Sequence, residues 1–91
     1  MSVTVRLSSS LQRLTGNRRE LTAGGETVTA VLDALEVSCP GLKNRLFDDE
    51  GALRRFVMVF VDGVDVRSLQ GVETRTPPAC EIDIISAIAG G

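Results

Sequence analysis

Strict alternation of apolar and polar residues opens the chain. Residues 3–7 read Val-Thr-Val-Arg-Leu, the period of two that is typical of a strand buried on one face. A polar segment follows and ends at Gly16 and Asn17, which favour a turn. Residues 18–22 then predict a return strand, so the first part of the chain should form a hairpin with a wide loop.

The next segment has the spacing of an amphipathic helix. Thr27 is placed as an N-cap, with a hydroxyl able to accept a hydrogen bond from a free backbone N–H. The helix must end near Ser38, because Pro40 disfavours helical backbone at the residue before it. Residues 42–47 predict a further short helical turn. Apolar residues at i, i+3, i+4 and i+7 predict one core-facing stripe, made by Val28, Val31, Leu32 and Leu35.

The C-terminal half contains the strongest strand pattern. Residues 56–61 read Phe-Val-Met-Val-Phe-Val, and the Asp-Gly that follows is a preferred pair for a two-residue hairpin turn. Residues 64–66 should therefore return alongside. Residues 69–79 predict irregular structure, since two adjacent prolines exclude the interior of a strand or helix. Residues 81–85, Glu-Ile-Asp-Ile-Ile, predict the last strand.

This order of elements indicates an α+β fold. A hairpin, a helix, a short helical turn, a second hairpin and a final strand pack most simply as one mixed sheet of four to five strands with one main helix packed across it. The first and last strands would be parallel neighbours in the middle of the sheet. This arrangement is the β-grasp, or ubiquitin-like, fold. We expect residues 1–91 to form a single domain with a C-terminal tail at about residues 87–91.

The composition narrows the classes of function. Hydrophobic residues make up 43% of the chain and charged residues 24%, the balance of a folded domain, and the net charge of −2 argues against nucleic acid as a partner. The sequence has no His, so imidazole triads are excluded, and we expect no bound metal. Three successive carboxylates at residues 48–50 are interpreted as a solvated acidic turn, with a cation site as the alternative.

The chain carries no sign of export or of membrane insertion. Its start lacks a basic region followed by an apolar run, and no apolar stretch approaches the roughly 20 residues of a membrane span. Cys39 and Cys80 are not spaced as a metal pair and are expected to be buried thiols. We therefore expect a cytoplasmic protein with no membrane partner.

The end of the chain is the strongest candidate for chemistry. Gly90 and Gly91 lack Cβ atoms, so they could thread a channel too narrow for side chains. Small, uncharged residues precede them, Ile88 and Ala89 among these. The terminal carboxylate would then project with nothing hindering attack at its carbonyl carbon. The alternative is a frayed terminus without a function.

Residues 87–91, Ala-Ile-Ala-Gly-Gly, resemble the tail of the MoaD/ThiS family of ubiquitin-like sulfur carriers. Residues 60–67, Phe-Val-Asp-Gly-Val-Asp-Val-Arg, resemble the branch of that family that includes the sulfur carrier of thiocarboxylate-dependent cysteine biosynthesis. Two positions depart from the family pattern. Residues 77–80 replace its Asp-Gly-Asp-type turn, and Ser86 replaces the proline before the tail.

The resemblance implies a carrier and not an enzyme. A ubiquitin-activating-type enzyme would use ATP to adenylate the carboxylate of Gly91, and a sulfur donor would displace AMP to leave a thiocarboxylate. Gly90, Ala89 and Ile88 would thread the partner's active site. A second, sulfur-accepting biosynthetic enzyme would take the sulfur, for cysteine or for a specialised sulfur-containing metabolite. The carrier itself would bind no cofactor and contribute no catalytic residue.

Three other functions stay open at this point. Within the same family, the small subunit of molybdopterin synthase would have a similar fold and tail. A ubiquitin-like protein modifier would join its Gly91 carboxyl group to lysines. A plain β-grasp interaction module would carry its two terminal glycines by accident.

The strand at residues 56–61 provides a candidate docking surface. Its valines share one face, which suits contact with the helix, and Phe56, Met58 and Phe60 share the other face. We interpret this second face as the surface that docks on the partner enzyme. The alternative is that the loop at residues 69–75 covers it.

Overall fold

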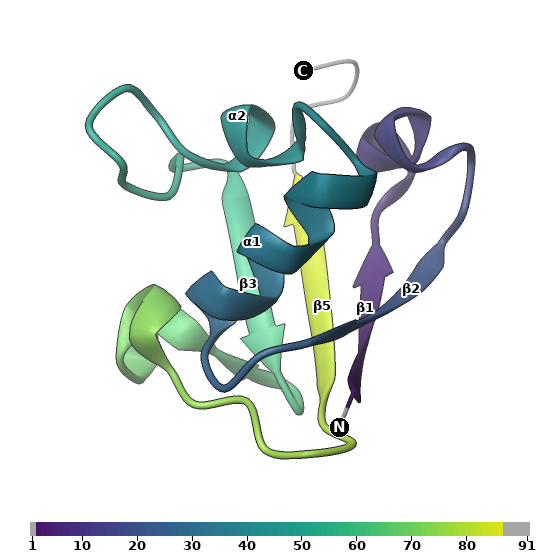
Figure 1. Ribbon diagram of the computed structural model, residues 1–91. Coiled ribbons are helices and arrows are strands. Elements are labelled where there is room, and N and C mark those ends of the chain that lie inside the picture. The colour runs from purple at the N-terminus through teal and green to yellow at the C-terminus, as the bar shows by residue number, and fades with distance from the viewer. Residues whose placement is uncertain (1, 87–91) are drawn as a thin grey trace.

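The computed structural model describes residues 2–86 and places them in one five-stranded sheet with helix α1 crossing one of its faces (Figure 1). The strands lie in the order β2-β1-β5-β3-β4. They are β1 (Ser2–Leu7), β2 (Glu20–Gly24), β3 (Val57–Val61), β4 (Val64–Asp65) and β5 (Glu81–Ser86). The helices are α1 (Val28–Ser38), α2 (Leu42–Leu46) and three 3₁₀ helices, η1 (Ser9–Thr15), η2 (Val66–Ser68) and η3 (Gly71–Glu73).

The first and last strands are parallel neighbours at the centre of the sheet. Val5 of β1 lies beside Ile82 of β5. Strands β2 and β3 pair antiparallel on either side of this central pair, and β4 pairs antiparallel with β3 at the edge. The order, the directions and the single main helix confirm the predicted β-grasp fold.

Helix α1 begins and ends where its sequence signals predict. The Thr27 side chain accepts a hydrogen bond from the N–H of Ala30 at 3.2 Å, which satisfies one free donor of the first turn. The predicted apolar stripe is fully buried against the sheet. The carboxylate of Glu36 accepts the N–H groups of Gly41 and Lys43 at 2.9 and 2.8 Å, and these two hydrogen bonds lower the pKa of that carboxyl. Glu36 thus joins the end of α1 to the start of α2.

The second hairpin has the turn that its sequence predicts. Asp62 and Gly63 have φ angles of 50° and 85°, so both central residues occupy the left-handed region that a type I′ turn requires. The return strand is shorter than expected. It ends at Asp65, and the chain turns inward so that Val66 is fully buried.

Two boundaries in the first hairpin also differ from the prediction. The wide loop contains the 3₁₀ helix η1, whose Leu11 is buried in the core. The return strand covers Glu20–Gly24 instead of residues 18–22, because pairing begins only where the chain comes alongside β1, at Glu20 opposite Arg6.

The core lies between the helices and the inner face of the sheet, the face that α1 covers. Valine and isoleucine side chains of the three inner strands and the stripe of α1 form most of it. Its fully buried members include Val5, Val28, Val31, Leu32, Val57, Val59 and Ile84. Helix α1 does not cover the outer face of the same strands (Figure 1).

Candidate functional site

The end of β5 is held by hydrogen bonds to the start of η1. Ser86 lies opposite Val57 of β3, and its N–H donates to Oγ of Ser8 at 3.1 Å. The N–H of Ser8 in turn donates to the carbonyl of Ile84 at 3.0 Å. A proline at position 86 could not donate the first of these bonds. Ser86, the last described residue of β5, is therefore anchored.

The predicted tail residues lie outside the described part of the chain. These are Ile88, Ala89, Gly90 and Gly91. Their assignment as the group that is loaded and threaded stays a prediction from the sequence.

The outer face of the sheet carries an apolar patch next to this end of β5. Met58 and Phe60 project from β3, as predicted, and Ile85 of β5 lies directly opposite Met58. Met58 and Ile85 are 36% and 40% exposed, and Phe60 is partly buried. We call Met58, Phe60 and Ile85 the outer patch. Side chains this exposed are available for contact with another surface.

The sequence analysis missed Ile85, although a signal for it exists. In β5 the outward positions carry Glu81, Asp83 and then Ile85. The alternation thus places a β-branched apolar residue on the polar face at its third outward position. An apolar residue at an outward position, where the preceding outward residues are charged, indicates a contact surface.

Charged side chains border the outer patch toward β1 and β2. Arg6 pairs with Glu20 at 3.3 Å and with Glu81 at 2.9 Å, which ties β2, β1 and β5 together on this face. A shallow depression of about 320 Å³ runs between the two regions, with Phe60 and Ile85 on one side and Arg6 on the other. The outer face is therefore divided into an apolar half and a charged half.

The prediction that Phe56 shares this face is wrong. Strand β3 begins only at Val57, whose N–H donates to the carbonyl of Arg54 at 3.0 Å and closes a turn. Phe56 lies in that turn, is partly buried and packs against the core. Alternation of faces applies only within a strand, so it could not place a residue that precedes one.

The alternative that residues 69–75 cover the outer face is not what the structure shows. The hydroxyl of Thr29 in α1 donates to the carbonyl of Val72 at 3.0 Å, and the N–H of Val28 donates to the carbonyl of Thr74 at 3.0 Å. The loop therefore packs on the helix, at the start of α1, and leaves the outer patch uncovered by that segment.

The two cysteines are buried free thiols, as predicted. Cys39 and Cys80 are each 4% exposed. Burial, with a smaller effect from the carboxylate of Asp62, raises the pKa of the Cys80 thiol. A buried, protonated thiol is a poor nucleophile, so Cys80 is unsuited to carrying sulfur as a persulfide.

The acidic turn has a structural role. Oδ1 of Asp48 accepts the N–H groups of Glu50 and Ala52 at 2.9 and 3.0 Å, which fixes the turn itself. Across residues 2–86, no three His, Cys, Asp or Glu side chains are grouped so as to hold a metal ion. No helix in that range has the length and apolar character needed to cross a membrane.

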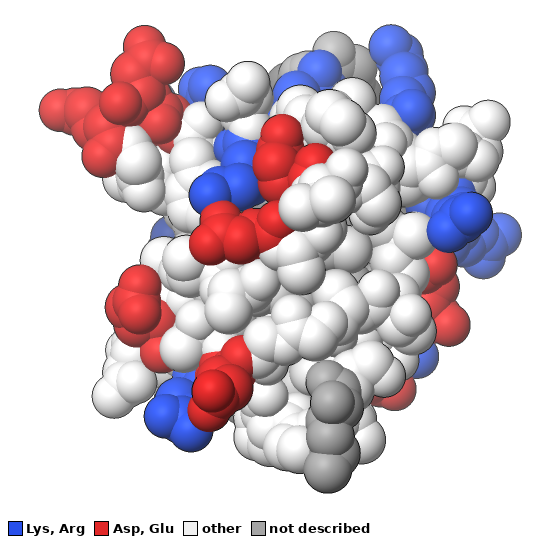
Figure 2. Space-filling model, viewed as in Figure 1, with Lys and Arg blue, Asp and Glu red and all other residues white. Residues whose placement is uncertain are grey.

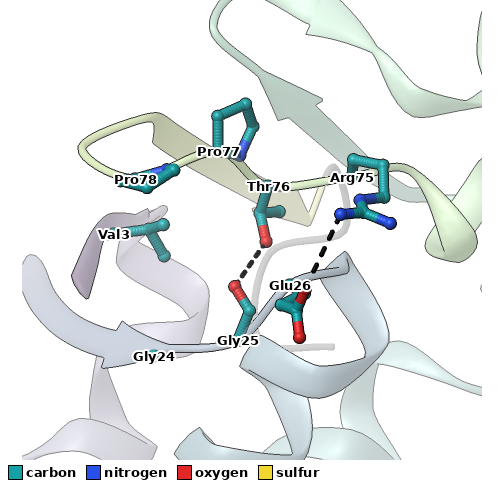
Figure 3. Close-up of a pocket in the computed structure, with 8 residues that line it drawn as sticks. All are labelled: Val3, Gly24, Gly25, Glu26, Arg75, Thr76, Pro77 and Pro78. Carbon is teal, nitrogen blue, oxygen red and sulfur yellow. Dashed lines mark hydrogen bonds and ion pairs between the residues drawn. The ribbon is translucent and has the colours of Figure 1, made fainter. Parts of the chain in front are cut away.

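A second groove lies at the opposite end of the sheet from Ser86. It has a volume of about 620 Å³, and Figure 3 shows Val3, Pro77 and Pro78 on one side of it, facing the segment around Gly25. Thr76 donates through its hydroxyl to the carbonyl of Gly25 at 2.8 Å, and this bond joins the two sides. The groove is remote from the end of β5, so we do not assign it to the tail.

Comparison with known proteins identifies the family. A profile of the ThiS family matches residues 5–91. The Mycobacterium tuberculosis protein called sulfur carrier protein CysO is 37% identical over 93 residues, covering 100% of both chains. A chain in the crystal structure of the Amycolatopsis orientalis BexX/CysO complex superposes with a TM-score of 0.90 at 36% identity, covering 98% of this chain and 99% of that one.

A further similarity points to a related class. The solution structure of small archaeal modifier protein 1 from Methanosarcina acetivorans superposes with a TM-score of 0.82 at 31% identity, covering 99% of this chain and 96% of that one. Both sets of relatives extend over nearly the whole chain. The chain therefore belongs to the ThiS family of β-grasp proteins, as the resemblance of its tail and second hairpin predicted.

Proposed function

We propose that this protein is a sulfur carrier that is loaded at the carboxylate of Gly91. The observation that carries the proposal is the relationship to proteins called sulfur carriers, which extends over the full length of the chain, the tail included. The buried thiols support it indirectly, because a shielded Cys80 leaves the terminal carboxylate as the better site for sulfur. The protein would act as a cosubstrate of other enzymes and supply no catalytic residue.

The chemistry needs two steps, both performed on a partner enzyme of the ubiquitin-activating type. A carboxylate oxygen of Gly91 attacks the α-phosphorus of ATP, and pyrophosphate leaves, which gives an acyl-adenylate. Hydrosulfide then attacks the carbonyl carbon, AMP leaves and a thiocarboxylate forms with loss of a proton. No change of oxidation state is required when the donor is sulfide.

The thiocarboxylate would donate its sulfur to a substrate held by a biosynthetic enzyme. We favour a route to cysteine, or to a specialised sulfur-containing metabolite, over the role of molybdopterin synthase small subunit. The reason is that the relative at 37% identity is called sulfur carrier protein CysO, and the structural match at 36% identity comes from a BexX/CysO complex. ATP would be bound by the activating enzyme and not by the carrier.

The outer patch is our candidate for the docking surface on these enzymes. Met58, Phe60 and Ile85 lie on the same face, and Ile85, opposite Met58, directly precedes the anchored end of β5 at Ser86. A partner that contacts this patch would therefore stand close to Ser86, the residue that precedes the predicted tail in the sequence. Half-exposed apolar side chains of this kind gain free energy when a partner removes them from water.

Mass spectrometry tests the loading step directly. The purified chain is incubated with the adenylating enzyme of its own organism, ATP and sulfide. We expect a mass gain of one oxygen-to-sulfur exchange, which fragmentation places on Gly91, and no gain when ATP is omitted. A sulfur found on Cys39 or Cys80 would show a persulfide carrier and contradict the proposed chemistry.

The variant Gly90→Ala tests whether the tail needs its glycines for shape. Its Cβ widens the segment that must enter the partner, and a misplacement of about 1 Å at a reacting centre can slow a reaction around 100-fold. We expect a rate loss of that order in ATP–pyrophosphate exchange, with the free energy of unfolding unchanged. An exchange rate equal to that of the wild type would make the two glycines incidental and favour a plain interaction module.

A protein modifier is the second candidate function, because one well-superposed relative is called a small archaeal modifier protein. A modifier would form conjugates through isopeptide bonds between Gly91 and lysines of other proteins. Immunoblots of cell extracts, run with thiol reductant, distinguish the two. A ladder of conjugates that disappears when Gly91 is deleted would favour the modifier. If extracts of wild-type cells contain no such ladder, the result favours the carrier.

A further inference from the structure

Positive charge gathers around the end of β5. Arg54 and Arg55 precede β3, where the carbonyl of Arg54 accepts the N–H of Val57 at 3.0 Å. Val57 is the cross-strand neighbour of Ser86, the last described residue of β5. These two arginines therefore lie within a few residues of the cross-strand neighbour of Ser86.

Three other segments bring further arginines to the same end. The N–H of Arg54 donates to the carbonyl of Leu46, which places α2 and its Arg45 alongside. The guanidinium of Arg67 donates to the carbonyls of Val57 and Arg54 at 2.7 and 2.9 Å. Helix η1 contributes one more, and it touches β5 through the hydroxyl of Ser10, 3.5 Å from the carbonyl of Ser86. We call the five the basic collar: Arg13, Arg45, Arg54, Arg55 and Arg67.

The basic collar is not neutralised within the described part of the molecule. The ion pairs found in residues 2–86 join Arg6 to Glu20 and Glu81, Lys43 to Asp33, and Arg75 to Glu26. None of them involves a collar arginine. Figure 2 shows basic side chains along the upper edge of the molecule, and a cluster of acidic side chains projects from the left corner of that same edge. The guanidinium groups of Arg54 and Arg67 bond to backbone carbonyls, which leaves their charge uncompensated.

The opposite end of the sheet is acidic. The turn of the second hairpin, the loop after η2 and the segment before α1 all meet there. They bring together Glu26, Asp62, Asp65, Glu73 and Glu81. Arg75 pairs with Glu26 and Arg6 pairs with Glu81, so Asp62, Asp65 and Glu73 are the carboxylates at this end that no ion pair within residues 2–86 offsets. The net charge of −2 therefore conceals an uneven distribution of charge between the two ends.

We propose that the basic collar docks against an acidic protein surface surrounding the opening through which the tail enters its partner. This inference rests on the proposed carrier function and adds the charge that the partner must present. The acidic end of the carrier would repel such a surface, so the molecule would approach with its tail end first. Complementary charge of this kind acts mainly on the rate of association, which can rise by orders of magnitude above that of neutral surfaces.

A nucleic acid is the less favoured occupant of the basic collar. The chain as a whole is negative, and its acidic end would be repelled by a polyanion longer than the collar itself. The sequence has three phenylalanines and no Trp or Tyr, so it offers little aromatic surface for stacking bases. An oligonucleotide is therefore included in the test as an outcome that would overturn the proposal.

A matched pair of charge reversals tests the basic collar. Arg55→Glu changes an exposed side chain beside the end of β5, and Arg75→Glu changes an exposed side chain at the opposite end by the same two charges. Steady-state ATP–pyrophosphate exchange is measured with the adenylating enzyme at about 50 mM and about 0.5 M salt, which shortens the screening length several-fold. Chemical denaturation of each variant checks that it is folded.

For Arg55→Glu we expect kcat/KM to fall about tenfold at low salt, through KM, with kcat unchanged. The loss should shrink to about twofold at high salt. Arg75→Glu should remain within about twofold of the wild type at both salt concentrations. The double variant Arg13→Glu/Arg55→Glu should lose more than the single one.

Several results would overturn the proposal. Equal losses for the two single variants would show a general charge effect, and a loss confined to kcat would place the collar in the chemistry instead of the docking. Tight binding of a fluorescent oligonucleotide, lost in Arg55→Glu, would assign the collar to nucleic acid. A wild-type chain that is not adenylated at all would refute the carrier function, whereas an active wild type matched by Arg55→Glu would refute the basic collar alone.

Discussion

The two faces of the sheet come from the same strands, yet they have different surroundings. On the inner face, Val59 and Ile84 are fully buried beneath α1. On the outer face, the residues next to them along each strand, Phe60 and Ile85, are only partly shielded from water. The period of two thus separates the residues that stabilise the domain from those available to a partner.

This separation has a consequence for mutations. A truncation on the inner face should change the free energy of unfolding, whereas one on the outer face should change docking. In small domains the total stability is limited, so a carrier needs its recognition residues to be distinct from its core. Substitutions on the two faces measure how complete that separation is.

The largest effect is expected at Ile84, with its neighbour Ile85 as the matched control. Ile84→Ala removes a fully buried side chain and should cost about 2–5 kcal/mol of unfolding free energy. Ile85→Ala removes the same atoms from a side chain that is 40% exposed and should cost clearly less. Urea denaturation followed by circular dichroism measures both. Equal costs would mean that the outer patch is part of the core.

Phe60→Ala should give the next largest effect, on docking. If the outer patch contacts the activating enzyme, loss of the ring should weaken binding about tenfold or more, the cost of a typical central contact residue. Its cost in stability should stay well below the roughly 3–5 kcal/mol of a fully buried Phe. Isothermal titration calorimetry measures binding to the activating enzyme, and chemical denaturation measures the free energy of unfolding. Thr22→Ala, on the charged half of the same face, is the control. Normal binding by folded Phe60→Ala would leave the docking surface unassigned.

A smaller effect, of opposite sign, is expected in the turn before β5. The N–H of Cys80 donates to the carbonyl of Pro77 at 3.1 Å, and Ala79 has a φ of 67°. This is the position of a tight turn at which glycine is preferred, because a Cβ is strained there. Ala79→Gly should raise the unfolding free energy by up to about 1 kcal/mol, with the entropy of the unfolded glycine offsetting part of the gain.

The turn before β5 lies away from the outer patch, so Ala79→Gly should change stability without changing docking. The rate of adenylation should not change, and Pro78→Ala, which relaxes the neighbouring position, should lower stability instead. A stabilised Ala79→Gly with altered docking would show that the two properties are coupled through β5.

The smallest effect concerns Glu36, on the helical side of the sheet. Two backbone N–H groups lower the pKa of its carboxyl in the folded state. A lowered folded-state pKa contributes stability that is present above the unfolded pKa and is lost as the pH falls through the folded-state value. At pH 7 the variant Glu36→Gln should have a lower free energy of unfolding than the wild type. This difference should shrink as the pH falls to below about 4, where the carboxyl of Glu36 is protonated in the unfolded chain. Denaturation curves at several pH values measure this, and a constant difference would contradict it.

Local signals in the sequence correctly predicted helix α1 and the turn of the second hairpin. The spacing of the α1 stripe, the Thr27 cap and the Asp62 turn each depend on contacts within a few residues, and all three are confirmed. The parallel central pair of β1 and β5 was also predicted, because few packings accommodate this order of elements.

The candidate site was predicted less completely. The positions of Met58 and Phe60 followed from alternation, while Phe56 was misplaced because it precedes the strand. Ile85 was missed because its importance depends on lying opposite Met58, a partner 27 positions earlier in the chain. The order of elements predicts which strands are neighbours, but the residue-by-residue register that places Ile85 opposite Met58 is visible only in the structure.

The sequence by itself determined which faces are apolar, where α1 begins and ends, and the family to which the tail belongs. Only the tertiary structure decided how far each strand runs, which segment packs on α1, and which charges gather at each end of the sheet. The physical reason is the range of the interactions. Caps, turns and periodicity depend on near neighbours along the chain. The outer patch and the basic collar consist of segments that are distant in sequence and come together only in the folded domain.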